Sequence, residues 1–479
     1  MRKWLHWAGW GMFTAMVAGW LGAVLAPGSR LYAEDLKAAA DKPVGAEDAI
    51  AKAVALDGPL ARYVRKADDS FTWTVRRTGM VGKASYVELT LTSQTWRDIP
   101  WKHQLFIMRP SRVDHAQDAV LVIAGGRWDD AYAAPPAEGE RLPREATLLA
   151  NAAELLQAPI AVLRQVPEQP ILGGLFEDAA IAYTFDQYLR SGEEDWPLLL
   201  PMVKSAVKGM DAVQQYARQH WDLDVKRFTV TGASKRGWTT WLTAAVDPRV
   251  VALAPMVIDV LNMPQQMQHQ LATWGQFSAM IADYTRRNIP QRAVTAAGKE
   301  LNSIVDPYSY REHLRQPKLI LLGTNDPYWP LDALNLYWDG LTGDKYVVYV
   351  PNAGHGLEGV EGLSRVLGGV VALHQSAQGR RTLPQLDWKM VEENGALTIH
   401  VRSDQKPQQV TLWSTTSDTR DFRQAKWTSQ PAEANGEGYV ARLPLPEAGF
   451  AAGFVELTYE GSLPLFLSTN VRIVEGRSE

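Results

Sequence analysis

The stretch FTVTGASKRGWTTW, residues 228–241, decides the fold of this chain of 479 residues. Phe228 to Thr231 favour a β-strand, and the small residues that follow allow a sharp turn at Ser234 before a helix begins. A serine on a strand-to-helix turn serves either as an exposed nucleophile or as the N-cap of the helix. The spacing G-x-S-x-x-G is one residue longer than the usual G-x-S-x-G of a nucleophile turn, so both uses stay open on this stretch alone.

Strands alternate with helices on both sides of this turn. Patterns typical of buried strands occur at residues 119–126, 158–164, 227–231, 250–258, 318–323 and 345–350. Helices are expected at residues 143–157, 178–190 and 197–220, from the Ser234 turn to about 246, at 331–340 and after His355. This alternation predicts a mostly parallel α/β sheet. Residues 86–92 and 103–109 alternate in polarity, which predicts a hairpin at an antiparallel edge.

Two segments depart from the α/β pattern. Residues 260–312 have no strand pattern and are rich in Gln, Met and aromatic residues, which predicts a helical cap over the sheet. Residues 385–479 hold short alternating stretches separated by turn residues, which predicts an all-β module of the size of an Ig-like sandwich. The α/β domain would then span residues 34–384.

The N-terminus has the pattern of a targeting segment. Arg2 and Lys3 precede residues 7–26, which carry no charge. A basic start followed by an apolar stretch predicts a signal peptide within residues 1–33. The uncharged run is also long enough to span a bilayer, so membrane attachment through residues 7–26 is the alternative. Both interpretations predict an exported protein, in the periplasm or outside the cell.

Three residues with the chemistry of a catalytic triad each follow a predicted strand. Ser234 follows 227–231, Asp326 follows 318–323 in GTNDPYW, and His355 follows 345–350 in PNAGHG. Taken singly they have ordinary explanations: a helix cap, an aspartate in a turn before proline, and a loop histidine. Their order, Ser then Asp then His at successive strand ends, is that of the α/β-hydrolase fold. The combination therefore predicts that His355 is the base and that Asp326 orients it.

An oxyanion hole in this fold needs two backbone N–H groups. One follows the nucleophile, at Lys235; the other follows an earlier strand, at Gly126 or Arg127, although two glycines there also suit a plain turn. Four further residues are candidates for contact with substrate: Glu177, Asp178, Arg236 and Trp329. The alternative for Glu177 and Asp178 is a carboxylate pair favoured by a helix N-terminus.

Composition excludes several other functions. The net charge is −4, which gives no basic surface for nucleic acid. The chain has no cysteine, which excludes thiol catalysis. No phosphate-binding loop and no zinc-ligand spacing occurs in the sequence, so we expect neither a metal nor a cofactor.

The strings GASKRGW, GTNDPYW, PNAGHG and LFEDAAIAYTFDQYL with EEDWPLLLPM resemble the PhoPQ-activated pathogenicity-related proteins, from about residue 50 to the C-terminus and including Asp418 to Arg423. The resemblance implies secreted or envelope proteins with an α/β-hydrolase fold and a poorly defined activity. The Ser234 turn also resembles the nucleophile turn of glucuronoyl esterases, where a basic residue after the serine helps to hold the oxyanion. By that resemblance the Lys235 side chain would assist; a solvated lysine at a helix start is the alternative.

The sequence as a whole predicts an exported serine hydrolase that transfers an acyl group to water, from an ester rather than an amide. The cations Arg127, Lys235 and Arg236 would favour an acidic or carbohydrate-linked acyl donor. The alternatives are a peptidase and a binding or signalling protein on a hydrolase scaffold. The substrate would accordingly be a small molecule, a glycan or a peptide; its identity, the oligomeric state and the role of the β module stay open.

Overall fold

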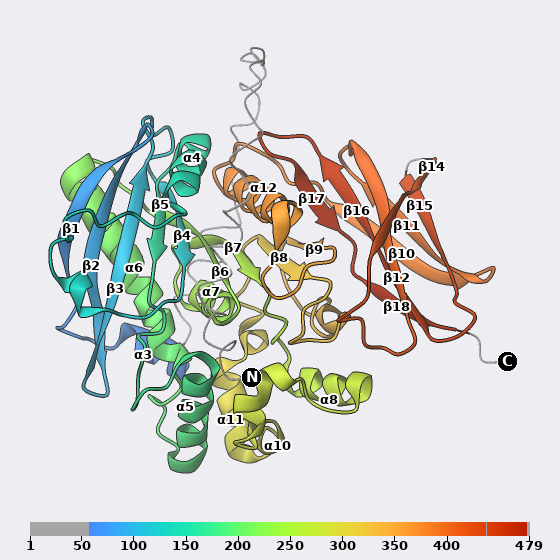
Figure 1. The fold of residues 1–479 in the computed structure, drawn as a ribbon, viewed down its shortest axis with the longest axis horizontal. Helices are drawn as coiled ribbons and strands as arrows, with labels where there is room; N and C mark the ends of the chain where they lie inside the picture. The colour runs from blue at the N-terminus through green and yellow to red at the C-terminus, as the bar shows by residue number, and fades with distance from the viewer. Residues whose placement is uncertain (1–56, 437, 477–479) are drawn as a thin grey trace.

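The computed structural model describes residues 57–436 and 438–476 (Figure 1). The predicted signal peptide or membrane anchor, with the first residues of the α/β domain, lies outside this range. None of the helices in the described part of the chain combines the length and apolar character needed to cross a membrane.

The core of the protein is a twisted sheet with a parallel centre and an antiparallel edge. Its strands are β1 (Thr72–Val81), β2 (Ala84–Trp96), β3 (Ile99–Arg109), β4 (Asp118–Ile123), β5 (Ile160–Leu163), β6 (Arg227–Ala233), β7 (Val250–Met256), β8 (Lys318–Gly323) and β9 (Lys345–Val350). They lie in the order β1-β2-β3-β5-β4-β6-β7-β8-β9. Strands β1 to β3 pair antiparallel, whereas β5 to β9 pair in parallel. This topology confirms the predicted α/β-hydrolase fold.

Helices cover both faces of the sheet because its central strands are apolar on both sides. In β4, Val120 and Val122 face the cluster that contains α4 (Ala146–Leu156), and Leu121 and Ile123 face the cluster that contains α6 (Leu199–Trp221). Helix α12 (Gly359–Ala377) joins α4 on the first face (Figure 1). Helix α7 (Lys235–Val246) joins α6 on the other, where α3 (Pro59–Arg65) also packs against α6.

The chain between β7 and β8 forms the predicted helical cap. It contains α8 (Met263–Trp274), η2 (Ala279–Ile281), α9 (Ala282–Thr285), α10 (Ile289–Arg292), α11 (Ala296–Val305) and η3 (Pro307–Tyr310). Helix α5 (Glu177–Ser191) lies beside it at the same end of the molecule (Figure 1). The helix expected at 331–340 is wrong: this stretch forms only the short 3₁₀ turn η4 (Ala333–Leu336), and another such turn, η1 (Asp130–Ala133), follows β4.

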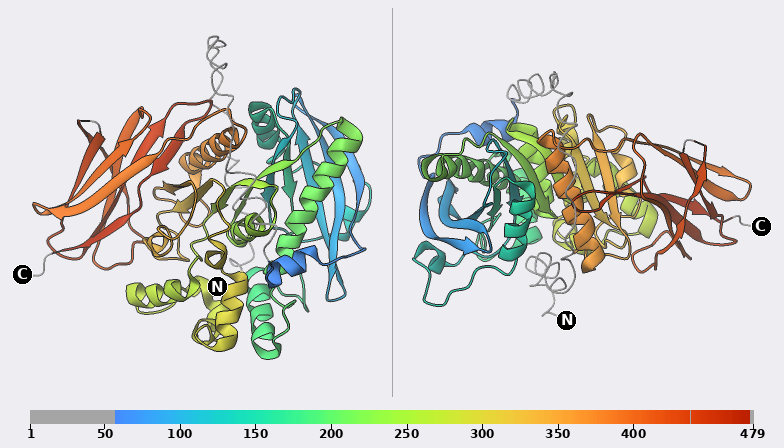
Figure 2. Two further views of the ribbon diagram at one scale, coloured as in Figure 1. Left: turned by 180° about the vertical axis from the view of Figure 1, so that it is seen from behind. Right: turned by 90° about the horizontal axis from the view of Figure 1, so that it is seen from above.

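The C-terminal module consists of two antiparallel sheets at the opposite end of the long axis from β1 (Figure 2). One sheet contains β10 (Leu386–Glu393), β11 (Ala396–Ser403), β14 (Glu433–Asn435) and β15 (Gly438–Pro444). The other contains β12 (Gln409–Ser417), β13 (Thr428–Pro431), β16 (Phe450–Tyr459), β17 (Leu465–Ser468) and β18 (Arg472–Glu475). The second sheet continues the α/β sheet, because Ser468 of β17 pairs with Val347 of β9. The Ig-like topology and the domain boundaries stay predictions.

A buried ion pair also links the two parts. Arg365 of α12 donates from Nε and from a terminal nitrogen to the two carboxylate oxygens of Glu456 in β16, at 2.8 and 2.9 Å. Their side chains are only 6 % and 4 % exposed. The Trp413 indole N–H donates to the same carboxylate at 3.1 Å, so the buried charge is well satisfied.

Removal of the arginine should therefore destabilise the whole protein. We expect Arg365→Met to lower the free energy of unfolding by about 3–5 kcal/mol, because Glu456 would stay buried without a cation. Denaturant titration followed by tryptophan fluorescence measures the loss. The double variant Arg365→Met/Glu456→Gln should recover part of it, and an unchanged midpoint in Arg365→Met would contradict the role given to this pair.

Candidate active site

Ser234 occupies a strained backbone position between β6 and α7. Its φ of 57° and ψ of −126° lie in a region that residues other than glycine rarely adopt. The turn closes tightly: a Cβ atom at Gly232 would lie 2.7 Å from the Arg236 carbonyl oxygen, and one at Gly237 would lie 2.7 Å from Ile258. These two glycines are therefore the ones that the turn needs. The Ser234 side chain does not cap the helix, so it is free for another partner.

That partner is His355. The Ser234 hydroxyl lies 2.9 Å from His355 Nε2, and His355 Nδ1 lies 2.7 Å from Asp326 Oδ2. Nδ1 must carry the proton in the neutral ring, because it faces a carboxylate, which leaves Nε2 as an acceptor for the serine hydroxyl. Ser234 is 6 % exposed and Asp326 9 % exposed, so the chain of hydrogen bonds is shielded from most of the solvent.

The loops that carry Asp326 and His355 are held together and braced locally. A Cβ atom at Gly323 would lie 2.3 Å from the Gly354 carbonyl oxygen, so only glycine allows the two loops to approach this closely. The second oxygen of Asp326 accepts the Tyr328 backbone N–H at 2.8 Å. The Tyr328 ring stacks on the His355 ring, with centroids 4.1 Å apart and planes at 28°. The Asp326 carboxylate and the His355 imidazole are thus held in a fixed relative orientation.

The residues expected to form the oxyanion hole share this edge of the sheet. Strands β4 and β6 are neighbours with Ile123 opposite Gly232, so Gly126 and Lys235 each lie three residues beyond a paired position. Gln169 holds the β4 turn, since its Nε2 donates to the Gly126 carbonyl at 3.0 Å and its own carbonyl accepts the Trp128 N–H at 3.1 Å. Within the described residues, the backbone N–H groups of Arg127 and Lys235 have no intramolecular acceptor.

Arg236 stands where the usual nucleophile turn has glycine, and it has a structural task. Its guanidinium donates to both oxygens of Glu177 at 2.7 Å and to the Val166 carbonyl at 2.6 Å. The same group packs on Gly125, where a Cβ atom would lie 2.2 Å from it. Arg236 is 5 % exposed, so it supports from beneath the turn at residues 125–127, which we call the oxyanion turn after the role predicted for it.

Lys235 is likewise buried and ion-paired. Its Nζ lies 2.9 Å from Asp178 and 3.5 Å from Glu177. Burial lowers the pKa of Lys235, but Asp178 and Glu177 outweigh this effect and raise the pKa above its usual value. Burial raises the pKa of Glu177, but Arg236 and Lys235 outweigh it and hold the pKa well below the usual range. Both lysine and glutamate therefore stay charged at neutral pH.

Two tyrosines complete this charged group. The Tyr284 hydroxyl of the cap donates to Asp178 at 3.0 Å, and the Tyr328 hydroxyl lies 3.5 Å from the same carboxylate. Burial raises the pKa of Tyr328 to about 12, with Lys235 acting in the opposite direction. The tyrosines are thus protonated and able to donate.

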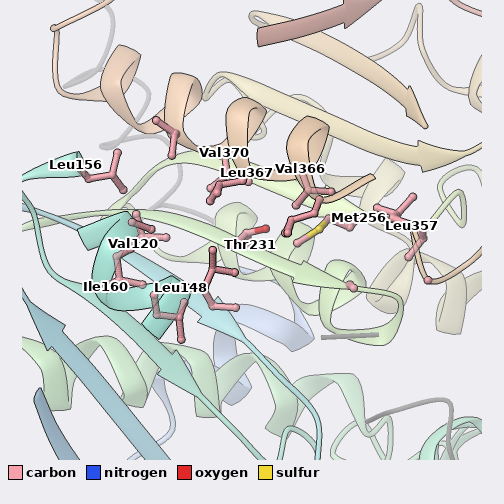
Figure 3. Close-up of a pocket in the computed structure, with 18 of the residues that line it drawn as sticks. Val120, Leu148, Leu156, Ile160, Thr231, Met256, Leu357, Val366, Leu367 and Val370 are labelled. Carbon is pink, nitrogen blue, oxygen red and sulfur yellow. The ribbon is translucent and has the colours of Figure 1, made fainter. Parts of the chain in front are cut away.

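An apolar cavity of about 90 Å³ lies on the α4 and α12 face of the sheet and reaches the His355 loop (Figure 3). Leu148, Leu156, Leu367 and Val370 are among the residues that line it. The hydroxyl of Thr231 also borders it, but donates to the Ala254 carbonyl. His355 also borders the cavity, so the apolar space lies directly beside the predicted base.

The structure brings the residues predicted from the sequence together on one edge of the sheet, but with different partners. Glu177 and Asp178 lie in the first turn of α5, as expected for a carboxylate pair at a helix N-terminus. They also lie beside the Ser234 turn, where they form ion pairs with Arg236 and Lys235. Trp329 is 8 % exposed and belongs to the apolar core. Within the described residues, no group of three His, Cys, Asp or Glu side chains is arranged to hold a metal ion.

Sequence reasoning missed the residues that act through others. Tyr328 lies within the quoted string GTNDPYW, two residues after Asp326, and its aromatic character was the available signal. Gln169 and Tyr284 are isolated polar residues far from the triad in sequence, and no motif marks them.

Comparison with known proteins identifies relatives along most of the chain. The sequence model of the family described as PhoPQ-activated pathogenicity-related protein matches residues 60–423. Autocrine proliferation repressor protein A of Dictyostelium discoideum is 31 % identical over 435 residues, which cover 84 % of this chain and 86 % of that protein. The predicted family resemblance is confirmed.

Solved structures of low sequence identity align with about two thirds of this chain. Acetyl xylan esterase 1 from Thermoanaerobacterium sp. JW/SL YS485 is 14 % identical with a TM-score of 0.41, over 65 % of this chain and 89 % of that one. A glucuronoyl esterase from Solibacter usitatus is 13 % identical with a TM-score of 0.41, over 66 % and 91 % of the two chains. Similarities of this size bring neither an activity nor a substrate to this chain.

The support that Arg236 gives to the oxyanion turn can be tested by Arg236→Gly, which recreates the usual G-x-S-x-G spacing. We expect kcat for ester hydrolysis to fall by about 10- to 100-fold, because the turn would lose its support and shift. Steady-state kinetics measure this, and thermal unfolding should show a lower midpoint because Glu177 loses its closest cation. A variant as active as the wild type would show that the longer spacing has no such function.

Proposed function

This chain belongs to the PhoPQ-activated pathogenicity-related protein family, and from that premise and the geometry of its site we propose that it is a serine hydrolase. The observation that carries the proposal is the chain of hydrogen bonds from Ser234 through His355 to Asp326, at 2.9 and 2.7 Å. The strained backbone of Ser234 supports it, because such strain persists at functional sites and has no use in a helix cap. The hydrolase is of the acyl-transfer type.

The proposed reaction begins with attack of Ser234 Oγ on a carbonyl carbon while His355 Nε2 takes the hydroxyl proton. Asp326 stabilises the protonated imidazole from the Nδ1 side. The oxyanion would meet the backbone N–H groups of Lys235 and of Arg127 or Gly126. His355 then gives its proton to the leaving alcohol, and water releases the acyl group by the same steps in reverse order.

An ester fits this site better than a peptide. Enzymes that cleave peptides near the N-terminus need carboxylates for the substrate amine, and Glu177 and Asp178 are the carboxylates predicted to contact substrate. Both already neutralise Arg236 and Lys235. The acyl donor is therefore proposed to be an ester, in which the leaving group needs less assistance.

Of the three cations expected to favour an acidic or carbohydrate-linked acyl donor, Arg127 is the one still available to a substrate. Lys235 and Arg236 are paired, whereas Arg127 is exposed and, within the described residues, has no carboxylate partner. Its guanidinium lies 5.9 Å from the centre of the Phe176 ring. One cation beside the oxyanion turn supports an acidic group on the substrate less strongly than three would.

A second candidate is a signalling function. The name of the Dictyostelium discoideum relative, autocrine proliferation repressor protein A, favours it. A complete triad favours the enzyme, since a protein that only binds does not need all three residues. Export through residues 1–33 stays a proposal that rests on the sequence pattern alone.

The nucleophile can be tested by covalent labelling. We expect a fluorophosphonate probe to label the wild type and not Ser234→Ala, because the probe reacts only with an activated serine. Hydrolysis of p-nitrophenyl acetate should fall by at least about 1,000-fold in Ser234→Ala and in His355→Ala. Ser303→Ala, on the exposed surface of α11, is the matched control. Labelling that persists in Ser234→Ala would exclude this serine.

The bond cleaved can be tested with matched substrates. An ester and an anilide of the same acyl group differ only in the leaving group, so their ratio of kcat/KM reports the preference directly. We expect the ester to be favoured by at least about 100-fold, because no group beyond the triad assists amine departure. A higher kcat/KM for peptides, lost in Ser234→Ala, would identify a peptidase instead.

A further inference from the structure

The connection between β12 and β13, residues 418–427, lies against the loop that carries Asp326. We call it the bracing loop. Asn325 directly precedes Asp326, and its side-chain nitrogen lies 2.7 Å from the Ala425 carbonyl oxygen and 3.3 Å from those of Phe422 and Arg423. The C-terminal module thus holds the backbone next to Asp326 through the Asn325 side chain.

The bracing loop also holds the His355 loop. Asn352, three residues before His355, exchanges two hydrogen bonds with the Trp427 backbone: its oxygen accepts the N–H at 2.8 Å and its nitrogen donates to the carbonyl at 3.1 Å. The φ of Asn352 is 59°, a left-handed conformation that this pairing helps to hold. The same residue's N–H donates to Thr324, which precedes Asn325, at 2.9 Å.

The bracing loop is anchored at several points. Phe422 and Trp427 are each 2 % exposed and anchor it in the core. Arg423 donates to Asp421 at 2.8 Å, and its guanidinium lies 4.3 Å from the centre of the Trp274 ring in the cap helix α8. The loop thus contacts the buried core, the cap and the loops that carry Asp326 and His355.

We propose that Asn325 and Asn352 are positioning residues, through which the bracing loop of the C-terminal module fixes the distance between Asp326 and His355. The proposal rests on the serine hydrolase function proposed above. Neither asparagine touches the reacting atoms; each holds the backbone next to a residue that does. An error of about 1 Å in such a site costs about 100-fold in rate, so a template for both loops has a direct catalytic effect.

The test compares three asparagine variants in the full-length protein. Asn325→Ala and Asn352→Ala remove hydrogen bonds to the bracing loop. Asn335→Ala is the matched control, because Asn335 also donates to a carbonyl of the C-terminal module, that of Val471 at 3.0 Å, but lies on η4 outside both catalytic loops. The kcat and KM of p-nitrophenyl acetate hydrolysis are measured, with thermal unfolding in parallel.

In Asn325→Ala and Asn352→Ala we expect kcat to fall by about 10- to 100-fold with KM within about twofold of the wild type. A fall in kcat at nearly unchanged KM would separate a positioning role from a merely structural one. Asn335→Ala should keep the wild-type kcat. Asn352→Asp retains the acceptor for the Trp427 N–H and should recover part of the rate.

Two results would overturn the proposal: unchanged kinetics in both alanine variants, or an equal loss in all three variants that follows their loss of stability. If the alanine variants do not fold, Asn325→Ser and Asn352→Asp give the same comparison with smaller disruption. Failure of the proposed function would look different, because the wild type and Asn335→Ala would then both be inactive and unlabelled by a fluorophosphonate.

Discussion

The whole site depends on the close contact of backbone between β6 and α7 around Ser234. The backbone conformation of Ser234, with φ of 57° and ψ of −126°, is energetically unfavourable. It persists because the surrounding contacts hold it in place. Gly232 and Gly237 allow the approach, and the Ser234 N–H is fixed by the Met256 carbonyl at 2.9 Å. Strain in the turn thus places the hydroxyl toward His355 rather than toward the helix that it precedes.

The extra residue in the G-x-S-x-x-G spacing has a consequence for charge. It places Arg236 next to the buried Lys235, and Arg236 packs against Gly125 in the turn after β4. Two buried cations without partners would be costly. Glu177 and Asp178 at the start of α5 neutralise them, and Tyr284 ties this group to the cap. One buried ionic cluster therefore joins the Ser234 turn, the oxyanion turn and the cap. Removing a single charged residue from this cluster would destabilise the protein by more than the intact cluster stabilises it, because the partner charge would stay buried.

The sequence predicted most of the fold, and it predicted that Ser234, Asp326 and His355 lie close together, because strand ends and turn residues leave strong local patterns. It failed at 331–340, where apolar residues that suggested a helix instead pack as a short turn in the core. It also could not give the partners of Arg236 or Asn325. Contacts between residues far apart in the chain are set by three-dimensional packing, and single polar residues carry no periodic signal.

The sequence pattern changes near residue 385, but the contacts that support Asp326 and His355 extend beyond this point into the C-terminal module. Strand β17 extends the sheet beyond β9, and the pair of Arg365 with Glu456 joins the two parts through their shared core. The family match runs from residue 60 to 423 and ends inside the bracing loop. Since β8 and β9, whose ends carry Asp326 and His355, are the strands nearest the module, the module is where support for these two loops is available. Ser234 directly follows β6 in the middle of the sheet, and its backbone is held instead by Met256 of β7 and Trp238 of α7.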